Sequence, residues 1–230
     1  MKLGKRLKQI DELVDSSYDH IWDCCCDHGF LGAQLLSRGA GGHIHFVDIV
    51  ENLMAKVESN LQRFFLDSDT PWSVHCIDVA TLPLKQHSGR HLIIIAGVGG
   101  DLMIDLINSI LDRNPAATID FLLCPVHHQY NVRYCLNKHD FQLRRETLIE
   151  ENKRYYEILL VSSELDNRES KPIAATGSDI WKPKTSEQFN VATGYLKKTL
   201  AHYYRIAQGA GSDHQAVIDA YERVQIEPIE

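Results

Sequence analysis

The chain has 230 residues, of which 24 are Lys or Arg and 31 are Asp or Glu, so its formal net charge is −7. This length suits one α/β domain with an appendage, and no stretch approaches the roughly 20 apolar residues that a membrane span requires. A nucleic-acid binder with this acidic balance would have to gather its positive charge locally.

The first segment is predicted to be an amphipathic helix with a basic outer face. Leu3, Leu7, Ile10 and Val14 recur at helical spacing. Charged residues stand where a signal peptide would need an apolar core, so we expect a cytoplasmic protein. The six cysteines contain no C-x-x-C pair, which favours small buried residues in a reducing compartment.

The stretch that follows is typical of the opening of a βαβ unit. Asp19–Cys25 is predicted to be a strand and Gly29–Arg38 a helix, with a polar corner between them. The helix N-terminus would point its backbone N–H groups at this corner, so a polar or anionic ligand is expected there. The corner is not a G-x-G-x-x-G loop, because only Gly29 and Gly32 are present.

Alternating strands and helices continue through the chain and predict an α/β fold. The sheet is expected to be doubly wound, Rossmann-like and mostly parallel, and closed by an antiparallel strand pair. The predicted strands are His43–Val47, Ser73–Ile77, Leu92–Ala96 and Ile119–Cys124, then the antiparallel pair Phe141–Ile149 and Tyr155–Val161. The predicted helices are Asn52–Phe65, one through Leu102, Leu106 and Ile110, and Tyr130–Asn137.

The last third of the chain has a different pattern. Residues 1–163 would form the sheet domain, and residues 164–184, which are polar and contain prolines, are predicted to be a linker or loop. Residues 185–230 are predicted to form a coiled-coil-like helical hairpin with a turn at 209–213, because Phe189, Leu196 and Tyr203 recur every seven residues.

Acidic residues end two successive predicted strands. Asp48 follows Asp23 by 25 residues and is placed to accept hydrogen bonds from ribose hydroxyls. Asp78 could accept from an adenine amino group, with Val79 beside the ring; alternatively, each Asp simply caps the next helix. With the glycine-rich exit Gly97–Gly100, the pattern is that of class I S-adenosylmethionine-dependent methyltransferases. NAD binding is the rival, but the loop that would cradle a pyrophosphate is missing.

Several motifs resemble the bacterial TrmK family. Asp23–Leu31 resembles that family's D-I-G-S-D-H-A-Y-L, and Ile95–Gly100 resembles its I-A-G-M-G-G. Glu150–Glu157 resembles its E-E-D-G-K-x-Y-E hairpin. The basic first helix and the helical hairpin also fit. The resemblance implies methylation of N1 of adenine 22 in tRNA, with S-adenosylmethionine as cofactor.

The resemblance also implies site residues. The residues expected at the cofactor are Asp23, Cys24, Cys25, Asp27, Gly29, Asp48, Ile49, Asp78, Val79, Ala96, Gly97 and Gly99. Those expected at the tRNA are Lys2, Lys5, Arg6, Lys8, Gly100, Tyr155, Tyr156, Lys197 and Lys198.

Three departures indicate a divergent member of that family. Cys25 replaces a glycine, Cys124-Pro125-Val126 replaces Q-P-N, and the exit of the second strand lacks a glycine-proline pair. The target nucleotide or the activity could therefore differ.

Adenine N1 has its own lone pair, so catalysis would chiefly position donor and acceptor. Asp27 is the expected catalytic carboxylate, stabilising the charge that develops on the base or accepting an N6 proton, with His28 orienting it or stacking on the base. Alternatively, Asp27 only caps the following helix.

Other functions stay open at this point. They are a methyltransferase for another RNA site, a protein or a small molecule; a non-catalytic RNA-binding protein; and, last, an NAD-linked oxidoreductase. The spacings of His43 with His45 and of His127 with His128 match no familiar metal site, so no metal is expected. The oligomeric state is left open.

Overall fold

The computed structural model describes residues 3–164, 171–209 and 214–229. Within them, one mixed sheet carries eight strands in the order β3-β2-β1-β4-β5-β7-β6-β8. The strands are β1 (His20–Cys24), β2 (His43–Asp48), β3 (Trp72–Cys76), β4 (His91–Ala96), β5 (Ile119–Cys124), β6 (Gln142–Glu151), β7 (Arg154–Ser162) and β8 (Lys171–Pro172). Strands β1 to β5 pair in parallel, and β7, β6 and β8 pair antiparallel. The predicted Rossmann-like sheet is confirmed.

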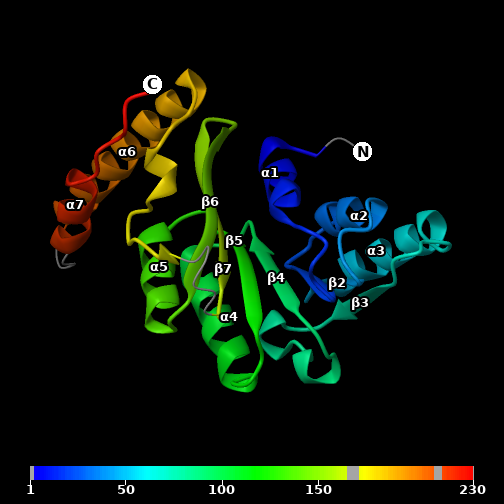
Figure 1. Cartoon of the computed structure of the whole chain (residues 1–230). Coiled ribbons are helices and arrows are strands. Elements are labelled where there is room, and N and C mark those ends of the chain that lie inside the picture. The colour runs from blue at the N-terminus through cyan, green and yellow to red at the C-terminus, as the bar shows by residue number, and fades with distance from the viewer. Residues whose placement is uncertain (1–2, 165–170, 210–213, 230) are drawn as a thin grey trace.

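Helices cover both faces of this sheet (Figure 1). One face packs against α1 (Lys5–Leu13), α2 (Phe30–Ser37) and α3 (Glu51–Phe64). The other packs against α4 (Gly100–Arg113), α5 (Gln129–Lys138) and the 3-10 turns η1 (Val79–Thr81) and η2 (Leu84–Gln86). Because the central strands β4 and β5 are covered on both sides, their sequences are nearly continuous apolar runs, as in His91–Ala96.

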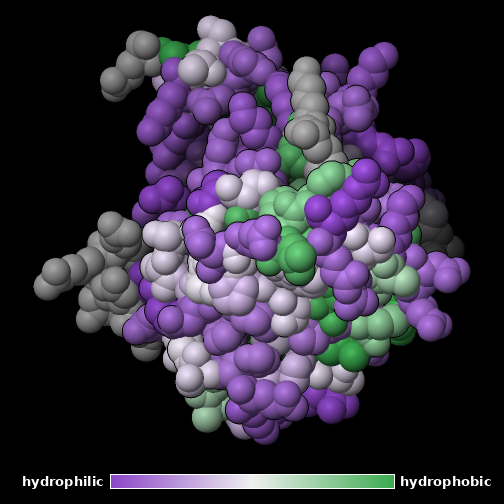
Figure 2. All heavy atoms as spheres, turned by 90° about the vertical axis from the view of Figure 1, so that its right-hand side faces the viewer, coloured by the Kyte–Doolittle hydropathy of each residue, from purple (hydrophilic) through white to green (hydrophobic). Residues whose placement is uncertain are grey.

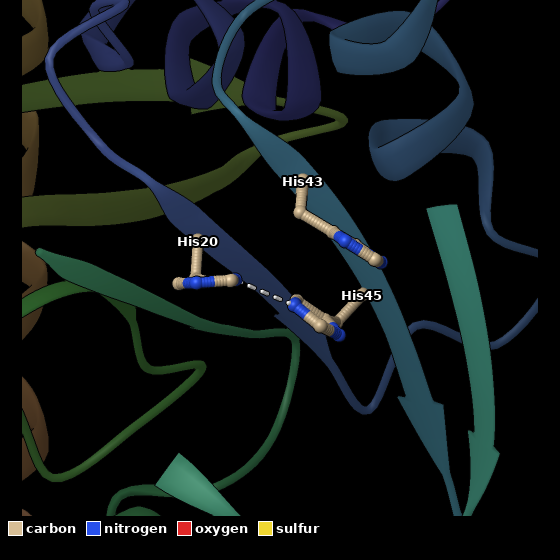
Figure 3. Close-up of side chains that lie close together, drawn as sticks. All are labelled: His20, His43 and His45. Carbon is tan, nitrogen blue, oxygen red and sulfur yellow. Dashed lines mark hydrogen bonds between the residues drawn. The ribbon is translucent and has the colours of Figure 1, made fainter. Parts of the chain in front are cut away.

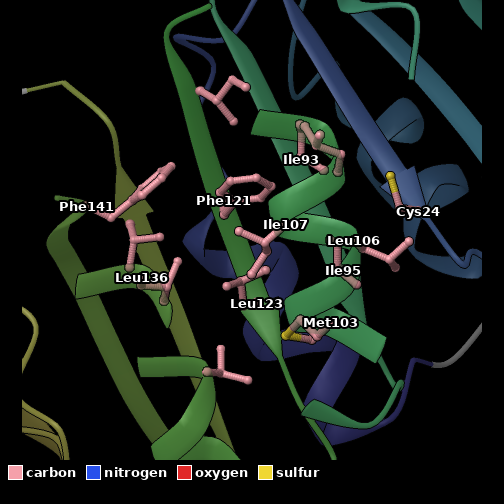
Figure 4. Packing of buried hydrophobic residues seen from close by; sticks show 14 of the residues in the cluster. Cys24, Ile93, Ile95, Met103, Leu106, Ile107, Phe121, Leu123, Leu136 and Phe141 are labelled. Carbon is pink, nitrogen blue, oxygen red and sulfur yellow. The ribbon is translucent and has the colours of Figure 1, made fainter. Parts of the chain in front are cut away.

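The core on the second face is built by alternate residues of the central strands. Ile93 and Ile95 of β4 and Phe121 of β5 point toward α4 and are fully buried there (Figure 4). Phe121 also meets Phe141, with ring centroids 5.4 Å apart. Burial of each such side chain contributes about 1.5–3 kcal/mol, so this layer holds rigid the strand ends that form the site.

The C-terminal helices form a separate body beside the hairpin of β6 and β7 (Figure 1). They are α6 (Ser186–Ala207) and α7 (Gln215–Glu222), and they pack on each other as predicted. Most of the turn predicted at 209–213 lies outside the described residues. The segment expected to be a linker or loop contains β8 and η3 (Asp179–Trp181), and it buries Ile180 and Trp181 against α6.

A buried ionic network fastens this C-terminal body to the sheet. Arg133 of α5 donates from Nε to Glu157 Oε2 (2.8 Å) and from Nη2 to Glu146 Oε2 (2.6 Å). Tyr195 of α6 donates its hydroxyl to Glu157 Oε1 (2.6 Å) and also hydrogen-bonds Tyr221 of α7. The two carboxylates hold the pKa of Arg133 above its usual value against the effect of burial. The network therefore ties α5, β6, β7, α6 and α7 into one unit.

Apolar surface gathers on the side of the molecule where α2 and α3 lie (Figure 2). Phe30 and Phe64 are exposed there and line a groove of about 430 Å³ between the two helices. Among the described residues, none of the helices combines the length and the apolar character needed to cross a membrane.

Candidate functional site

The corner between β1 and α2 adopts an unusual backbone. Cys25 (φ 54°), Asp27 (φ 51°) and Gly29 (φ 68°) are all in the left-handed region. That region favours glycine, and side-chain-bearing residues enter it at a cost. Cys25, where the family motif has glycine, therefore has a backbone conformation that favours glycine.

Asp23 anchors the helix that follows this corner. Its side chain is buried, and Oδ2 accepts a hydrogen bond from the Gly32 backbone N–H (2.8 Å). Burial, against the lowering effect of the Gly32 hydrogen bond and with a smaller contribution from the Asp48 carboxylate, raises the pKa of Asp23 to about 7. The carboxylate that bonds the first turn of α2 thus belongs to Asp23, whereas Asp27 is exposed.

The carboxylates of Asp48 and Asp78 lie at the same corner. Burial raises the pKa of the Cys25 thiol to about 11, together with the charges of Asp48, Asp23 and Asp78. The three carboxylates stand at or just beyond the carboxyl ends of the neighbouring strands β1, β2 and β3. They form what we call the acidic corner: Asp23, Asp48 and Asp78 around Cys25.

Both strand-end carboxylates also bond to backbone. Asp48 accepts from the Asp27 N–H at Oδ2 and from the Val50 N–H at Oδ1, both at 3.1 Å. Asp78 caps η1 through the Ala80 N–H (2.9 Å), as the capping alternative expected. Ile49, 69% exposed, stands beside Asp48 and offers an apolar face at the edge of the acidic corner.

The exit of β4 passes beneath an arginine. Gly97 has φ 86°, and a Cβ at this position would lie 3.1 Å from Arg6 Nη1. Arg6 comes from α1, lies 5.3 Å above the Tyr156 ring and hydrogen-bonds Cys124 at the end of β5. Its charge lowers the pKa of Cys124, although burial dominates and raises that pKa to about 12. The guanidinium thus lies over the strand ends.

The remainder of the glycine-rich exit is pressed against the loop after β5. A Cβ at Gly99 would lie 2.5 Å from His127 Cε1, so a larger residue there would displace this ring. The Gly100 N–H donates to the His127 carbonyl (3.1 Å), and Val126 N–H donates to the Val98 carbonyl (3.0 Å). These hydrogen bonds join the loop after β4 to the loop after β5, beside the acidic corner.

A family model decides the class of the protein. The model described as a methyltransferase domain matches residues 3–159, more than half of the chain. The chain belongs to the methyltransferase domain family. A search of curated proteins gave no match.

Solved structures show the same fold over nearly the whole chain of this methyltransferase. The TrmK structure from M. capricolum, in complex with S-adenosyl-homocysteine, is 18% identical with TM-score 0.71 and covers 97% of each chain. The B. subtilis m1A22 tRNA methyltransferase TrmK is 18% identical with TM-score 0.68, covering 96% of this chain and 97% of its own. Streptococcus pneumoniae Sp1610 in complex with S-adenosyl-L-methionine is 20% identical with TM-score 0.66 and the same coverages.

The residues predicted at the cofactor divide into two groups in this methyltransferase. Asp23, Cys25, Asp48 and Asp78 come together at the acidic corner, as described above. Cys24 and Val79 are buried in the core. The predicted catalytic pair, Asp27 and His28, is exposed in the loop between β1 and α2, with Asp27 Oδ1 3.7 Å from His28 Nε2.

Among the described residues, the lysines predicted for RNA lie on two helices, α1 and α6. Lys5 pairs with Glu187 of α6 (3.0 Å), and Lys8 lies near Glu12 (3.9 Å). Lys198 lies 5.6 Å over the Tyr155 ring, and Lys197 is exposed. Gly100 is buried at the start of α4. Lys2 lies outside the described residues.

Three of the residues predicted for RNA, Tyr155, Tyr156 and Lys198, line one pocket together with residues that were not predicted. A hollow of about 380 Å³ lies between the loop after β5, the β6–β7 hairpin and α6. Its walls include Val126, His127, Tyr156, Lys198 and His202. These residues are far apart in sequence, and the only signal was the aromatic and basic character of the hairpin and α6.

Proposed function

We propose that this chain is an S-adenosylmethionine-dependent methyltransferase that acts on N1 of adenine 22 in tRNA. The observation that carries the proposal is the acidic corner at the carboxyl ends of the strands, in a chain that matches the methyltransferase family and has the TrmK fold over nearly its whole length. Fold alone does not fix a substrate. The choice of tRNA is supported by the similarity to TrmK structures over nearly the whole chain, and it is tested by nucleoside analysis.

The residues present fit the methyl donor. Asp48 would accept from the ribose hydroxyls, Asp78 would meet the adenine edge, and exposed Ile49 would cover the adenine face. The bound donor supplies an electrophilic methyl group on a sulfonium. Arg6, poised over Gly97, is placed to pair with a carboxylate at the methionine end, since guanidinium and carboxylate bond in a two-pronged geometry.

The chain's own residues would then position the base. Tyr156, beneath Arg6, and the pocket beside the β6–β7 hairpin offer stacking surfaces for a base taken out of the tRNA. Asp27, at the rim, would stabilise the positive charge that develops on the adenine, with His28 beside it. Lys5, Lys8, Lys197 and Lys198 would meet phosphates.

Nucleoside analysis tests the proposal. The protein is incubated with the donor and bulk tRNA, and the nucleosides are examined by mass spectrometry. We expect 1-methyladenosine, and none when a tRNA transcript carries another base at position 22. Asp48→Asn should lose both donor binding and turnover, whereas Asp112→Asn, an exposed change on α4, should retain both. Methylation elsewhere in the tRNA would move the target, and donor binding without any tRNA product would refute the tRNA assignment.

Two further variants separate binding from chemistry. Asp27→Ala should abolish methylation while calorimetry still detects donor binding; unchanged turnover would remove Asp27 from the mechanism. Arg6→Ala should weaken donor binding, whereas Lys5→Ala with Lys8→Ala should weaken only tRNA binding and reduce its salt dependence. If Arg6→Ala changed tRNA affinity alone, its assignment to the donor would be wrong.

A further inference from the structure

Six histidines gather around Trp22 on one face of the sheet, and three of them, His20, His43 and His91, are the first residues of their strands, at the ends opposite the acidic corner. The strand register places His20 of β1 beside His43 of β2 on one side and beside His91 of β4 on the other. His45 lies one step further along the same face of β2 and stacks on Trp22, with ring centroids 3.8 Å apart. The group consists of His20, His43, His45, His75, His87 and His91.

Nitrogen atoms of three of these rings converge. One ring nitrogen from each of His20, His43 and His45 lies within 4.8 Å of the other two. Figure 3 shows the three side chains on two neighbouring strands, with His20 pointing toward His45 and His43 stacked on His45; His20 Nδ1 is 3.1 Å from His45 Nε2. Ligand nitrogens around a tetrahedral zinc ion, at Zn–N distances of about 2.0–2.1 Å, are about 3.3 Å apart. The spacing already approaches that of a metal site.

The second nitrogen of each of these rings is held by a hydrogen bond. His20 Nε2 meets the Ser88 carbonyl (3.2 Å), His43 Nε2 meets Ser73 Oγ (2.9 Å), and His45 Nδ1 meets His75 Nε2 (3.0 Å). Metal-binding histidines characteristically have their other ring nitrogen fixed in this way, which sets tautomer and orientation. His20 Nδ1 and His45 Nε2, which hydrogen-bond to each other in this structure, would exchange that bond for the ion, and His43 Nδ1 would be the third ligand atom.

We propose that His20, His43 and His45 bind one divalent transition-metal ion, with Zn²⁺ as the best match. Three neutral imidazoles suit Zn²⁺, Cu²⁺ and Ni²⁺ rather than Mg²⁺ or Ca²⁺, which prefer oxygen ligands. Coordination requires the His43 ring to turn out of its stack on His45, where the centroids are 4.1 Å apart. His87, with its ring centroid 4.8 Å from that of His20, or a water molecule would fill the fourth position.

The proposed ion would have a structural role. It would join the first halves of β1 and β2, whereas the acidic corner lies at the last residues of the same strands. His45, the proposed ligand nearest that corner on β2, precedes Asp48 by three positions, about 10 Å along an extended strand. We therefore expect metal to change stability and to leave methyl transfer unchanged, so this proposal can fail independently of the proposed function.

Zinc titration of the untagged, EDTA-dialysed chain tests the site. Exposed Cys76 could bind zinc by itself, so the measurement uses a Cys76→Ser background. We expect one zinc per chain with a Kd of about 1 µM or lower. His20→Gln and His43→Gln should each weaken binding on the order of tenfold or more. His139→Gln is the matched control, because His139 is exposed and bonds Asn108 Oδ1 outside the group.

A second measurement needs no histidine variant. In the background protein, the ring-nitrogen resonances of three histidines should shift on addition of one equivalent of zinc, and the urea midpoint should rise. The proposal is overturned if zinc binds no more tightly than about 100 µM, if the two variants bind it as well as His139→Gln does, or if the shifting resonances belong to histidines outside the group.

Discussion

Removal of one hydroxyl from the buried ionic network should measurably loosen the C-terminal body. Tyr195→Phe retains the ring, which stacks on Trp181 with centroids 5.8 Å apart, and deletes the O–H donated to Glu157 Oε1. A hydrogen bond to a charged group contributes about 1.5–3 kcal/mol to stability. Because Glu157 is fully buried, no water replaces the lost donor. We expect the free energy of unfolding to fall by about 2 kcal/mol.

Urea unfolding followed by circular dichroism supplies the measurement, with the free energy taken from the midpoint and slope. Tyr134→Phe is the matched control, because Tyr134 is 55% exposed and meets only the Lys138 ammonium in a cation–π contact among the interactions described. It should change stability by less than about 0.5 kcal/mol. Equal stabilities for the two variants would show that the Tyr195 hydroxyl does not support the network, and the reasoning would be wrong.

Three further predictions concern the site. Cys25→Gly should raise the thermal midpoint by relieving a left-handed φ of 54°, a strain of about 1 kcal/mol; a lower midpoint would show that the thiol packing matters more. Gly97→Ala should weaken donor binding in calorimetry, because the new methyl meets Arg6 at a φ of 86°; unchanged affinity would contradict the placement of that guanidinium. The raised pKa of Asp23, about 7, means that the folded state holds a proton that the unfolded state releases near pH 4. Stability should therefore decrease as pH rises from 4 through 7, and Asp23→Asn should flatten this slope in denaturant titrations; an unaltered slope would assign it to another group.

The sheet was predictable because its signals are local. The run Leu92–Ala96 is wholly apolar, and Asp48 and Asp78 end the two predicted strands before it. Each of these patterns is complete within a few residues. The prolines and polar residues of 164–184 suggest a linker or loop, and they do not reveal that Ile180 and Trp181 are buried in the cluster that includes α6. Such burial depends on a distant partner and leaves no periodic pattern.

The site was predictable only in part for the same reason. Asp48 and Asp78 could be placed because parallel strands end at one edge. Arg6 was assigned to the outer face of a helix from its spacing, and only the packing of α1 over β4 shows that it reaches Gly97. The histidine group depends on the register between β1, β2 and β4. Register cannot be read from strands that are predicted one at a time.

The network around Arg133 has a consequence for how the chain folds. Its members are separated by up to 88 positions, from Arg133 to Tyr221, and all of them must desolvate together. Contacts between such distant residues form late, because the entropy cost of closing a long loop must be met before these contacts stabilise the chain. We therefore expect α6 and α7 to dock as a final, slow kinetic phase on a sheet that is already assembled.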